Sequence, residues 1–542
     1  MRGSRSLWLS ALAGIAMGIT GMPTPSHGQA IDAIFEPYGI SREPAPRLPR
    51  LLGMGGLTLL SDRDNRLSLW DFARNPVGLA REDSTSTLDF SPGATTTQAT
   101  RNGLPSGAPL PRQNLGAREV RMRYELIRRT PSRNGYGFYG DLGSDQTQRP
   151  FSNIVARRAF ASTPNGYGVI AGPIPSFLSG RMSYALRGGY TRQSAGDEYR
   201  LILSKPQGQY IDLEGDIVDP PNLFDPDQMD VTATGVGAGL AYELGPWLTA
   251  ALGVDGLQTK IDGVNDGVRH SSSRDSKRPY GIGQATLLGR IGNNFEWIAD
   301  GRGWQASNDE RWFFSISAGL QQFPLAGRGS FLRRYEEGSQ MRGRARWMLG
   351  SLELNGEVGT FYRKVRITPP ALDDRTSFNF FRNSIGTRPG TDSLFLADSV
   401  SAENSQVRDL SAAVGAGWRF MGDRARLAGE FHTLRQRTDQ LSSGAGPERK
   451  RWDARGGLEY RCSPQMVTAF GFRMTNEDQD ELTERNEYVR KQLTAGFTVR
   501  PREAHWEAGV GYGFEWSDPD FDSPADQRQT GQQFAAQVRW DL

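Results

Sequence analysis

The most regular feature of this chain is an alternation of apolar and polar residues, repeated in segments of roughly 10–15 residues from about residue 116 to the C-terminus. In segment 503–516, Trp506, Val510 and Phe514 fall on one face and Glu507 and Glu515 on the other. A period of two over this length is typical of β-strands and not of helices. Tight turns join such segments into hairpins at 341–349 with 351–364, 407–420 with 423–437, 452–461 with 465–475, and 489–499 with 503–516.

The length of these strands and the C-terminus indicate which kind of β protein this is. Trp506 and Trp516 share a face and lie roughly 33 Å apart along a strand. A tilt of about 35–45° projects this to roughly 23–27 Å, close to the ~25 Å apolar band of transmembrane barrels. The last ten residues alternate up to the end, with Trp540 and Leu542 on the apolar face, and resemble the closing strand of bacterial outer-membrane β-barrels. We predict an all-β fold, an antiparallel transmembrane β-barrel with an even number of strands, roughly 16–22.

The lengths of the connections orient the predicted barrel. Gly350-Ser351, Gly422-Asp423, Cys462-Ser463 and Pro501-Arg502 are predicted tight turns and should face the periplasm. Longer polar connections are predicted at 207–229, 262–278, 367–405, 438–448, 478–486 and 518–529, and should face the outside. The resemblance of the C-terminus implies that Trp540 and Leu542 are the signal read by the outer-membrane assembly machinery.

The N-terminus is predicted to direct secretion. Arg2 and Arg5 precede a mostly apolar run over 7–22, and small residues end a polar stretch at Ala30. This pattern is that of a signal peptide over 1–30, and the apolar run is shorter than the ~20 residues that a membrane anchor helix needs. We expect cleavage near Ala30 and localisation of the mature protein in the bacterial outer membrane, in contact with its lipid and lipopolysaccharide.

Residues 31–83 do not alternate and are predicted to form a separate N-terminal segment, with the barrel over 84–542. A short helix is expected over 67–75 and a first strand over 84–90. Trp70, Phe72 and Leu79 are the plug candidates, since apolar residues before a barrel either enter its lumen or cover its periplasmic mouth. A loose periplasmic tail is the alternative. The run 71–80 (DFARNPVGLA) resembles the Asn-Pro-Ala-Gly-Leu-Ala run near the start of long-chain fatty-acid transporter-like outer-membrane barrels. The resemblance implies an N-terminal plug and a route for hydrophobic molecules.

Composition limits the chemistry that the chain can perform. The formal net charge is only +3 and no basic region stands out, which argues against nucleic acid as a partner. One cysteine excludes an internal disulfide, and four histidines leave few options for an imidazole-based site. No metal-ligand spacing, phosphate loop or nucleophile elbow occurs on the predicted strands. We expect no cofactor, no metal and no enzymatic activity.

The polar faces of the strands are predicted to line the lumen with charges of both signs. Opposite charges on neighbouring strands can pair, at roughly 0.2–1 kcal/mol each. Such a wall favours polar solutes over apolar ones. The candidates for lining the lumen are Arg342, Arg344, Arg346, Glu353, Glu357, Arg424, Arg426, Glu430, His432, Glu503, His505 and Glu507.

The predicted function is a channel or transporter for small-molecule solutes, including hydrophobic ones, across the outer membrane. The alternative is a barrel that serves as scaffold or partner in secretion, surface attachment or envelope assembly. The sequence does not name a substrate.

Overall fold

The structure is a computed structural model. It describes residues 49–60, 86–101, 113–129, 134–150, 155–174, 181–201, 210–211, 217–218, 222–266, 270–292, 294–318, 321–323, 330–368, 405–440, 446, 448–480, 485–502, 504–518 and 527–541. The predicted plug residues Trp70, Phe72 and Leu79, the helix expected over 67–75, Glu503 and Leu542 lie outside this part of the chain, as does the predicted signal peptide over 1–30.

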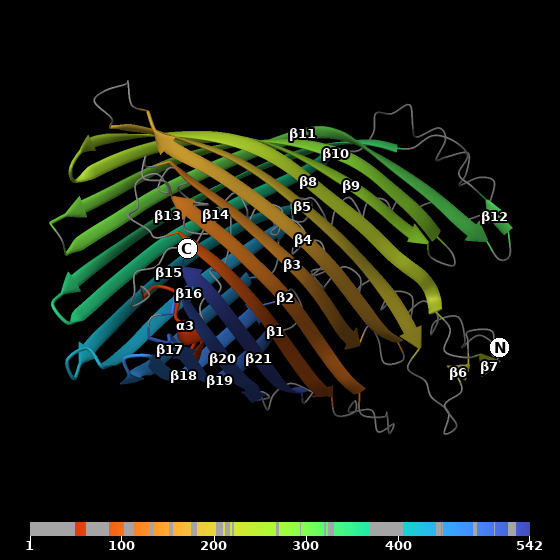
Figure 1. Cartoon of the computed structure of the whole chain (residues 1–542). Coiled ribbons are helices and arrows are strands. Elements are labelled where there is room, and N and C mark those ends of the chain that lie inside the picture. Colours follow the sequence, from red (N-terminus) through yellow and green to blue (C-terminus); the bar gives the residue numbers. More distant parts are fainter. Residues whose placement is uncertain are drawn as a thin grey trace.

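Eighteen long strands of the described residues form one closed antiparallel β-barrel (Figure 1). They are β1 (Thr87–Arg101), β2 (Gln113–Arg129), β3 (Gly135–Pro150), β4 (Val155–Pro173), β5 (Met182–Leu201), β8 (Asn222–Gly245), β9 (Leu248–Asp266), β10 (His270–Ile291), β11 (Phe295–Ala318), β13 (Ser330–Leu349), β14 (Leu352–Thr368), β15 (Ser405–Phe420), β16 (Ala425–Gln440), β17 (Glu448–Ser463), β18 (Met466–Asp480), β19 (Arg485–Val499), β20 (Trp506–Asp518) and β21 (Gln527–Asp541). Short β12 (Gln321–Phe323) pairs with β11, and β6 (Tyr210–Ile211) pairs with β7 (Ile217–Val218).

The barrel closes between its first and last strands. Each long strand pairs with the next in antiparallel order, and β21 pairs with β1, where Trp540 is opposite Leu88. Both β1 and β21 therefore begin or end at the same rim. That rim also carries the tight turns, which places it on the periplasmic side by the usual rule for such barrels. The predicted fold class and even strand number are confirmed.

Side chains alternate between lipid and interior along each strand, because successive residues of a strand point to opposite faces. On β8 and β9, Val236, Leu252 and Val254, at even positions, are 66–71% exposed on the outside, whereas Val231 and Leu257, at odd positions, are 2% exposed. In segment 506–514, Trp506, Val510, Tyr512 and Phe514 face outward as the sequence predicts. An apolar exterior around a closed sheet is the form in which strands can cross a bilayer, since all backbone groups are paired.

The sequence predicted two of the tight turns correctly, but it misplaced a third turn and the outer ends of several strands. Gly350 and Gly422 lie in tight turns as predicted, with positive φ of 61° and 63°. The turn predicted at Cys462-Ser463 instead lies two residues later, since β17 runs to Ser463. The outer loop predicted over 262–278 is wrong: β9 continues to Asp266 and β10 starts at His270. Likewise, β8 begins at Asn222, inside the loop predicted over 207–229.

The physical reason for the misplaced loops lies in the outward side chains. The outward positions become charged beyond the apolar belt, as at Lys260 and Asp262, which form an exposed ion pair. The sequence therefore looks like a loop there, while the backbone ladder between β8, β9 and β10 continues.

A short helix, α3 (Pro49–Gly53), precedes the barrel in sequence and contacts β18, β19, β20 and β21 (Figure 1). No helix in the described part of the chain is long and apolar enough to cross a membrane.

Candidate functional site

Residues 51–60 lie on the inner wall of the barrel, on a surface kept flat by glycines. A Cβ at Gly471 would lie 2.1 Å from the backbone nitrogen of Gly55, and one at Gly457 would lie 2.6 Å from Cα of Met54. Gly53 in turn approaches Gly496 so closely that a Cβ on Gly53 would lie 2.5 Å from the Gly496 nitrogen. We call Gly457, Gly471 and Gly496 the glycine track. It lets the backbone of the N-terminal segment contact the backbone of β17, β18 and β19.

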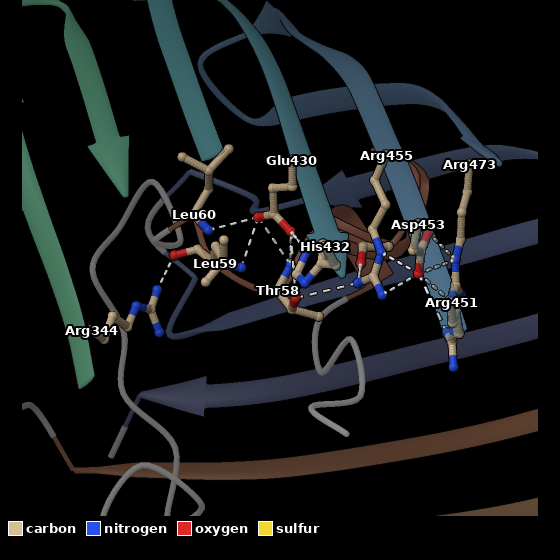
Figure 2. Close-up of polar contacts among 11 residues, drawn as sticks. Thr58, Leu59, Leu60, Arg344, Glu430, His432, Arg451, Asp453, Arg455 and Arg473 are labelled. Carbon is tan, nitrogen blue, oxygen red and sulfur yellow. Dashed lines mark hydrogen bonds and ion pairs between the residues drawn. The ribbon is translucent and has the colours of Figure 1, made fainter. Parts of the chain in front are cut away.

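Polar side chains of the wall bind the backbone of this segment (Figure 2). The Glu430 carboxylate accepts hydrogen bonds from the backbone N–H groups of Thr58, Leu59 and Leu60, at 2.9, 2.7 and 2.8 Å. Arg455 Nη1 donates to the carbonyl oxygen of Gly56 at 2.7 Å, and Arg344 donates to the carbonyl oxygen of Leu59.

Further along the segment, Thr494 Oγ1 donates to the Gly53 carbonyl at 2.9 Å and accepts from Gly55 N–H at 2.8 Å. These hydrogen bonds satisfy backbone N–H and C=O groups that a short irregular segment would otherwise leave buried without partners.

Apolar residues complete the contact between segment and wall. Leu51, Met54, Leu57 and Leu60 form a buried cluster with Ala428 and Ala469 of the wall, each no more than 7% exposed. Full burial of such side chains contributes about 1.5–3 kcal/mol each. The segment is thus held both by burial and by charge-assisted hydrogen bonds.

A cluster of arginines around one aspartate lies beside this contact. Asp453 Oδ2 accepts from Arg455 and from Arg473, both at 2.7 Å, and from Arg451 at 3.4 Å (Figure 2). Asp453 is directly opposite His432 on β16, and His432 Nε2 lies 2.9 Å from the Glu430 carboxylate. Arg455 Nη1 donates to the Thr58 hydroxyl at 3.3 Å, and that hydroxyl donates to Glu430 at 3.4 Å, so the acidic and basic groups under the segment are connected through Thr58.

Other inward charges are paired across the wall. Arg426 donates to Glu353 at 2.9 Å, Arg342 lies 3.2 Å from Glu357, and Arg187 forms a buried pair with Asp255. Arg346 lies between Glu353 and Glu296, at 3.5 and 3.7 Å. Removing one partner of such a buried pair is costly, about 3–5 kcal/mol, because a charge stays buried alone.

The interior also contains two apolar clusters, on the far side of the barrel from the segment in strand order. The first, the upper apolar cluster, consists of Val231, Ala233, Leu257, Ile261, Tyr280, Ile282, Trp304, Ala306 and Phe361. The second, the lower apolar cluster, consists of Ile127, Tyr139, Tyr167, Val169, Ala171, Ala185, Ala241 and Ala251, nearer the periplasmic rim. Within the upper cluster, the Trp304 ring crosses Gly338 and packs against Phe361 with ring centroids 5.6 Å apart.

Charged residues border the upper apolar cluster. The Tyr280 hydroxyl donates to Glu336 at 3.1 Å, and Glu336 also accepts from Arg363 at 2.8 Å and Arg334 at 3.3 Å. The lower cluster is separated from the upper one along β9 by Asp255 and its partner Arg187. The lumen wall is therefore not uniformly polar, unlike the wall that the sequence analysis described.

The structure places the predicted lumen residues in three settings. Arg342, Arg344, Arg346, Glu353, Glu357, Arg426, Glu430 and His432 lie on the inner face, with the partners given above, and Glu507 lies opposite Arg539 at the lower end of β20. Arg424 belongs to the exposed turn 421–424, so the prediction that it lines the lumen wall is wrong: β16, whose residues form that part of the wall, begins only at Ala425. His505 precedes β20 and is exposed at the rim.

Sequence reasoning missed the segment that contacts the wall and the apolar clusters. The run 50–60 (RLLGMGGLTLL) is the most apolar stretch between the predicted signal peptide and the first strand, and this apolar character is the sequence signal for its burial. Trp304 is two residues after Arg302 and four after Asp300, so it lies on the same face of the strand as these charged residues and is an aromatic on a polar face. Both signals were present in the sequence.

Comparisons with known proteins give no family for this chain and find only distant structural likenesses. No protein family matches the sequence, and no curated protein matches it. Solved structures that match include the toluene transporter TodX of Pseudomonas putida (9% identity, 92% of this chain and 99% of that chain, TM-score 0.37). They also include a FadL homologue of Pseudomonas aeruginosa (12%, 92% and 99%, 0.35) and the ferric yersiniabactin uptake receptor FyuA of Yersinia pestis (9%, 85% and 81%, 0.41).

At such TM-scores these neighbours carry no argument about substrate. The class follows from the chain itself: a closed antiparallel barrel with an apolar exterior, paired charges inside and a bound N-terminal segment. The protein is a transmembrane β-barrel of the outer-membrane type.

Proposed function

We propose that this protein is an outer-membrane channel for small hydrophobic molecules, with the N-terminal segment 49–60 as part of a plug. The observation that carries the proposal is the pair of apolar clusters on the inner wall. Barrel interiors that conduct water and ions are polar. Buried Ile282, Trp304 and Tyr167 on the inner face therefore call for a different explanation.

The two clusters lie in series along the same strands. On β9, Ile261 and Leu257 belong to the upper cluster and Ala251 to the lower one, and on β8 the sequence runs from Val231 to Ala241. Such an arrangement offers an apolar solute two consecutive contacts between the outer and periplasmic ends. The free energy gained by such a solute at each cluster would be about 25 cal/mol per Å² of apolar surface removed from water.

The charges between the clusters are compatible with this route. Asp255 and Arg187 neutralise each other at the boundary, with side chains 0% and 1% exposed. A solute passing a neutral, hydrogen-bonded pair avoids contact with an isolated charge, which would be far more costly to desolvate.

A scaffold role is the second candidate, and one observation favours it. The inner-face residues of both clusters are no more than 7% exposed, as expected of a filled interior and not of a wide open pore. A filled barrel would present its outer surface and rims to partners and would pass nothing.

Uptake of a hydrophobic fluorescent naphthylamine by cells that produce the protein distinguishes the two roles. A channel predicts uptake above that of cells without the protein, and lower uptake in the variant Ala233→Leu, because the larger side chain occupies part of the route along the upper cluster. Ala238→Leu is the matched control, because Ala238 faces outward on the same strand. Heat-modifiable migration verifies that each variant is folded.

Uptake equal to that of cells without the protein would refute the channel and favour the scaffold. Uptake that is high but equal in Ala233→Leu and Ala238→Leu would refute the route along the upper cluster.

A further inference from the structure

The outer face of β14–β17 carries a group of basic side chains directly beyond the apolar belt. We call Lys364, Arg366, Arg408, Arg435, Arg437 and Lys450 the outer basic patch. They continue the outward positions of their strands: on β15, Arg408 follows the parity of Leu410 and Val414, which are 59% and 61% exposed. The side chains of Arg435, Arg437 and Lys450 are 63, 55 and 56% exposed.

The strand register sets like charges against each other in this patch. Arg408 on β15 is directly opposite Arg437 on β16, and Arg435 on β16 is directly opposite Lys450 on β17. Directly opposite side chains on one face lie about 4.5–5.5 Å apart at Cβ, and like charges at that distance destabilise a sheet. Two such pairs side by side are a cost that the barrel fold itself does not require.

Carboxylates of the same and the neighbouring strands offset only part of this charge. Asp439 accepts from Arg437 at 2.7 Å, and Glu448 accepts from Arg435 at 2.6 Å and lies 3.6 Å from Lys450. Glu448 is also directly opposite Arg437, Glu337 on β13 is directly opposite Lys364, and Asp478 on β18 is directly opposite Lys450. Among the described outward side chains of β13–β18 beyond the belt, the six basic groups of the patch thus face four acidic ones. Exposed pairs of this kind contribute at most about 1 kcal/mol each.

The position of the outer basic patch along the barrel axis shows which part of the membrane surrounds it. The tight turns and both barrel ends lie at the opposite rim, so the patch is on the outer side of the membrane. At the edge of the belt, Phe431 packs against Trp452 with ring centroids 6.2 Å apart. The Tyr335 and Tyr362 hydroxyls donate to Glu337 at 3.1 and 3.5 Å. Aromatic residues with polar groups of this kind mark the membrane–water interface.

We propose that the outer basic patch binds the phosphate groups of lipopolysaccharide in the outer leaflet. A phosphate between two directly opposite basic side chains turns their repulsion into two attractions. Arginine suits it because its planar guanidinium can donate two parallel hydrogen bonds to phosphate oxygens. The position at headgroup height favours a lipid-borne phosphate over a phosphate dissolved in water, since the lipid supplies the anion at this level together with acyl chains for the apolar belt.

Binding of purified lipopolysaccharide to the full-length protein in detergent tests the proposal. The variant Arg408→Gln/Arg437→Gln removes one like-charge pair, and Arg435→Gln/Lys450→Gln removes the other. Each double variant should bind about 25-fold more weakly, at roughly fivefold per basic group near a charged membrane surface. The matched control is Arg290→Gln/Arg500→Gln at the periplasmic rim, where each arginine is exposed and has one carboxylate partner. The control should bind lipopolysaccharide as the unchanged protein does.

The thermal midpoint gives a second readout. Without lipopolysaccharide, the double variants should unfold at the same or a higher temperature, because repulsion has been removed. With it, they should lose the stabilisation that the unchanged protein gains. Dephosphorylated lipopolysaccharide should give no gain in any variant.

Three outcomes would overturn the proposal. The first is equal binding by the control and the double variants. The second is equal binding of dephosphorylated lipopolysaccharide. The third is full competition by inorganic phosphate at equal concentration, which would reveal a general anion site and not one for a lipid.

Discussion

Replacing Glu430 with alanine should release residues 58–60 from the inner wall. The Glu430 side chain accepts three backbone N–H bonds from the segment and a fourth, longer bond of 3.4 Å from the Thr58 hydroxyl. The residue is only 4% exposed, so water does not readily replace it. Alanine would leave three amides without their acceptor in a buried place.

The size of the effect follows from the type of bond. A hydrogen bond to a charged group contributes about 1.5–3 kcal/mol, and bonds that share one acceptor are not additive. We take about 3 kcal/mol for the free energy lost with the Glu430 hydrogen bonds. This corresponds to a rise of roughly 100-fold in the equilibrium constant for detachment of residues 58–60 from the wall. Glu430→Gln should lie in between, since it keeps one oxygen acceptor but turns an NH₂ group toward the segment.

Hydrogen–deuterium exchange of the Thr58, Leu59 and Leu60 amides measures this opening directly, because exchange requires the bonds to break. The three amides should exchange roughly 100-fold faster in Glu430→Ala. The matched control is Glu477→Ala, which removes another inward carboxylate, one that accepts from Arg449 at 2.7 and 2.8 Å and has no bond to the segment. Unchanged exchange in Glu430→Ala, or equal acceleration in the control, would refute the reasoning.

Four further predictions follow from the same structure. Gly471→Ala should speed exchange at residues 54–60, because its Cβ would lie 2.1 Å from the Gly55 nitrogen, whereas Gly283→Ala, which meets nothing within 4 Å, should not. Trp304→Ala should lower the midpoint of heat-modifiable migration, at a cost of about 3–5 kcal/mol for a buried aromatic; an equal midpoint would show that the upper cluster does not support the wall. Trp540→Asp should leave the protein unassembled, as it puts a carboxylate on the lipid face opposite Leu88, and normal insertion would contradict an assembly signal. Changing Arg342, Arg344 and Arg346 together to Ser should shift selectivity in planar bilayers toward cations, and unchanged selectivity would place the ion path elsewhere.

The sequence by itself determined the fold class and the two faces of each strand. Alternation is a local property, since successive side chains of any extended strand point to opposite sides. Trp506, Tyr512 and Phe514 could therefore be placed on the lipid face, and Arg426 and Glu430 inside, without knowledge of any partner strand. The tight turns at Gly350 and Gly422 were equally local, because only certain residues accept a positive φ at little cost.

Only the tertiary structure decided which of these residues meet. Glu430 and the amides of Thr58, Leu59 and Leu60 are about 370 positions apart in the chain, and Thr494 and Gly53 are 441 apart. The apolar clusters likewise need side chains from five strands in the upper cluster and six in the lower one, each set at one height. That height depends on the register between strands, and the register follows from pairings around the whole closed barrel, not from the pattern within any one strand. For the same reason the sequence could not reveal that Arg408 faces Arg437, or that glycines on three strands form one track for the N-terminal segment.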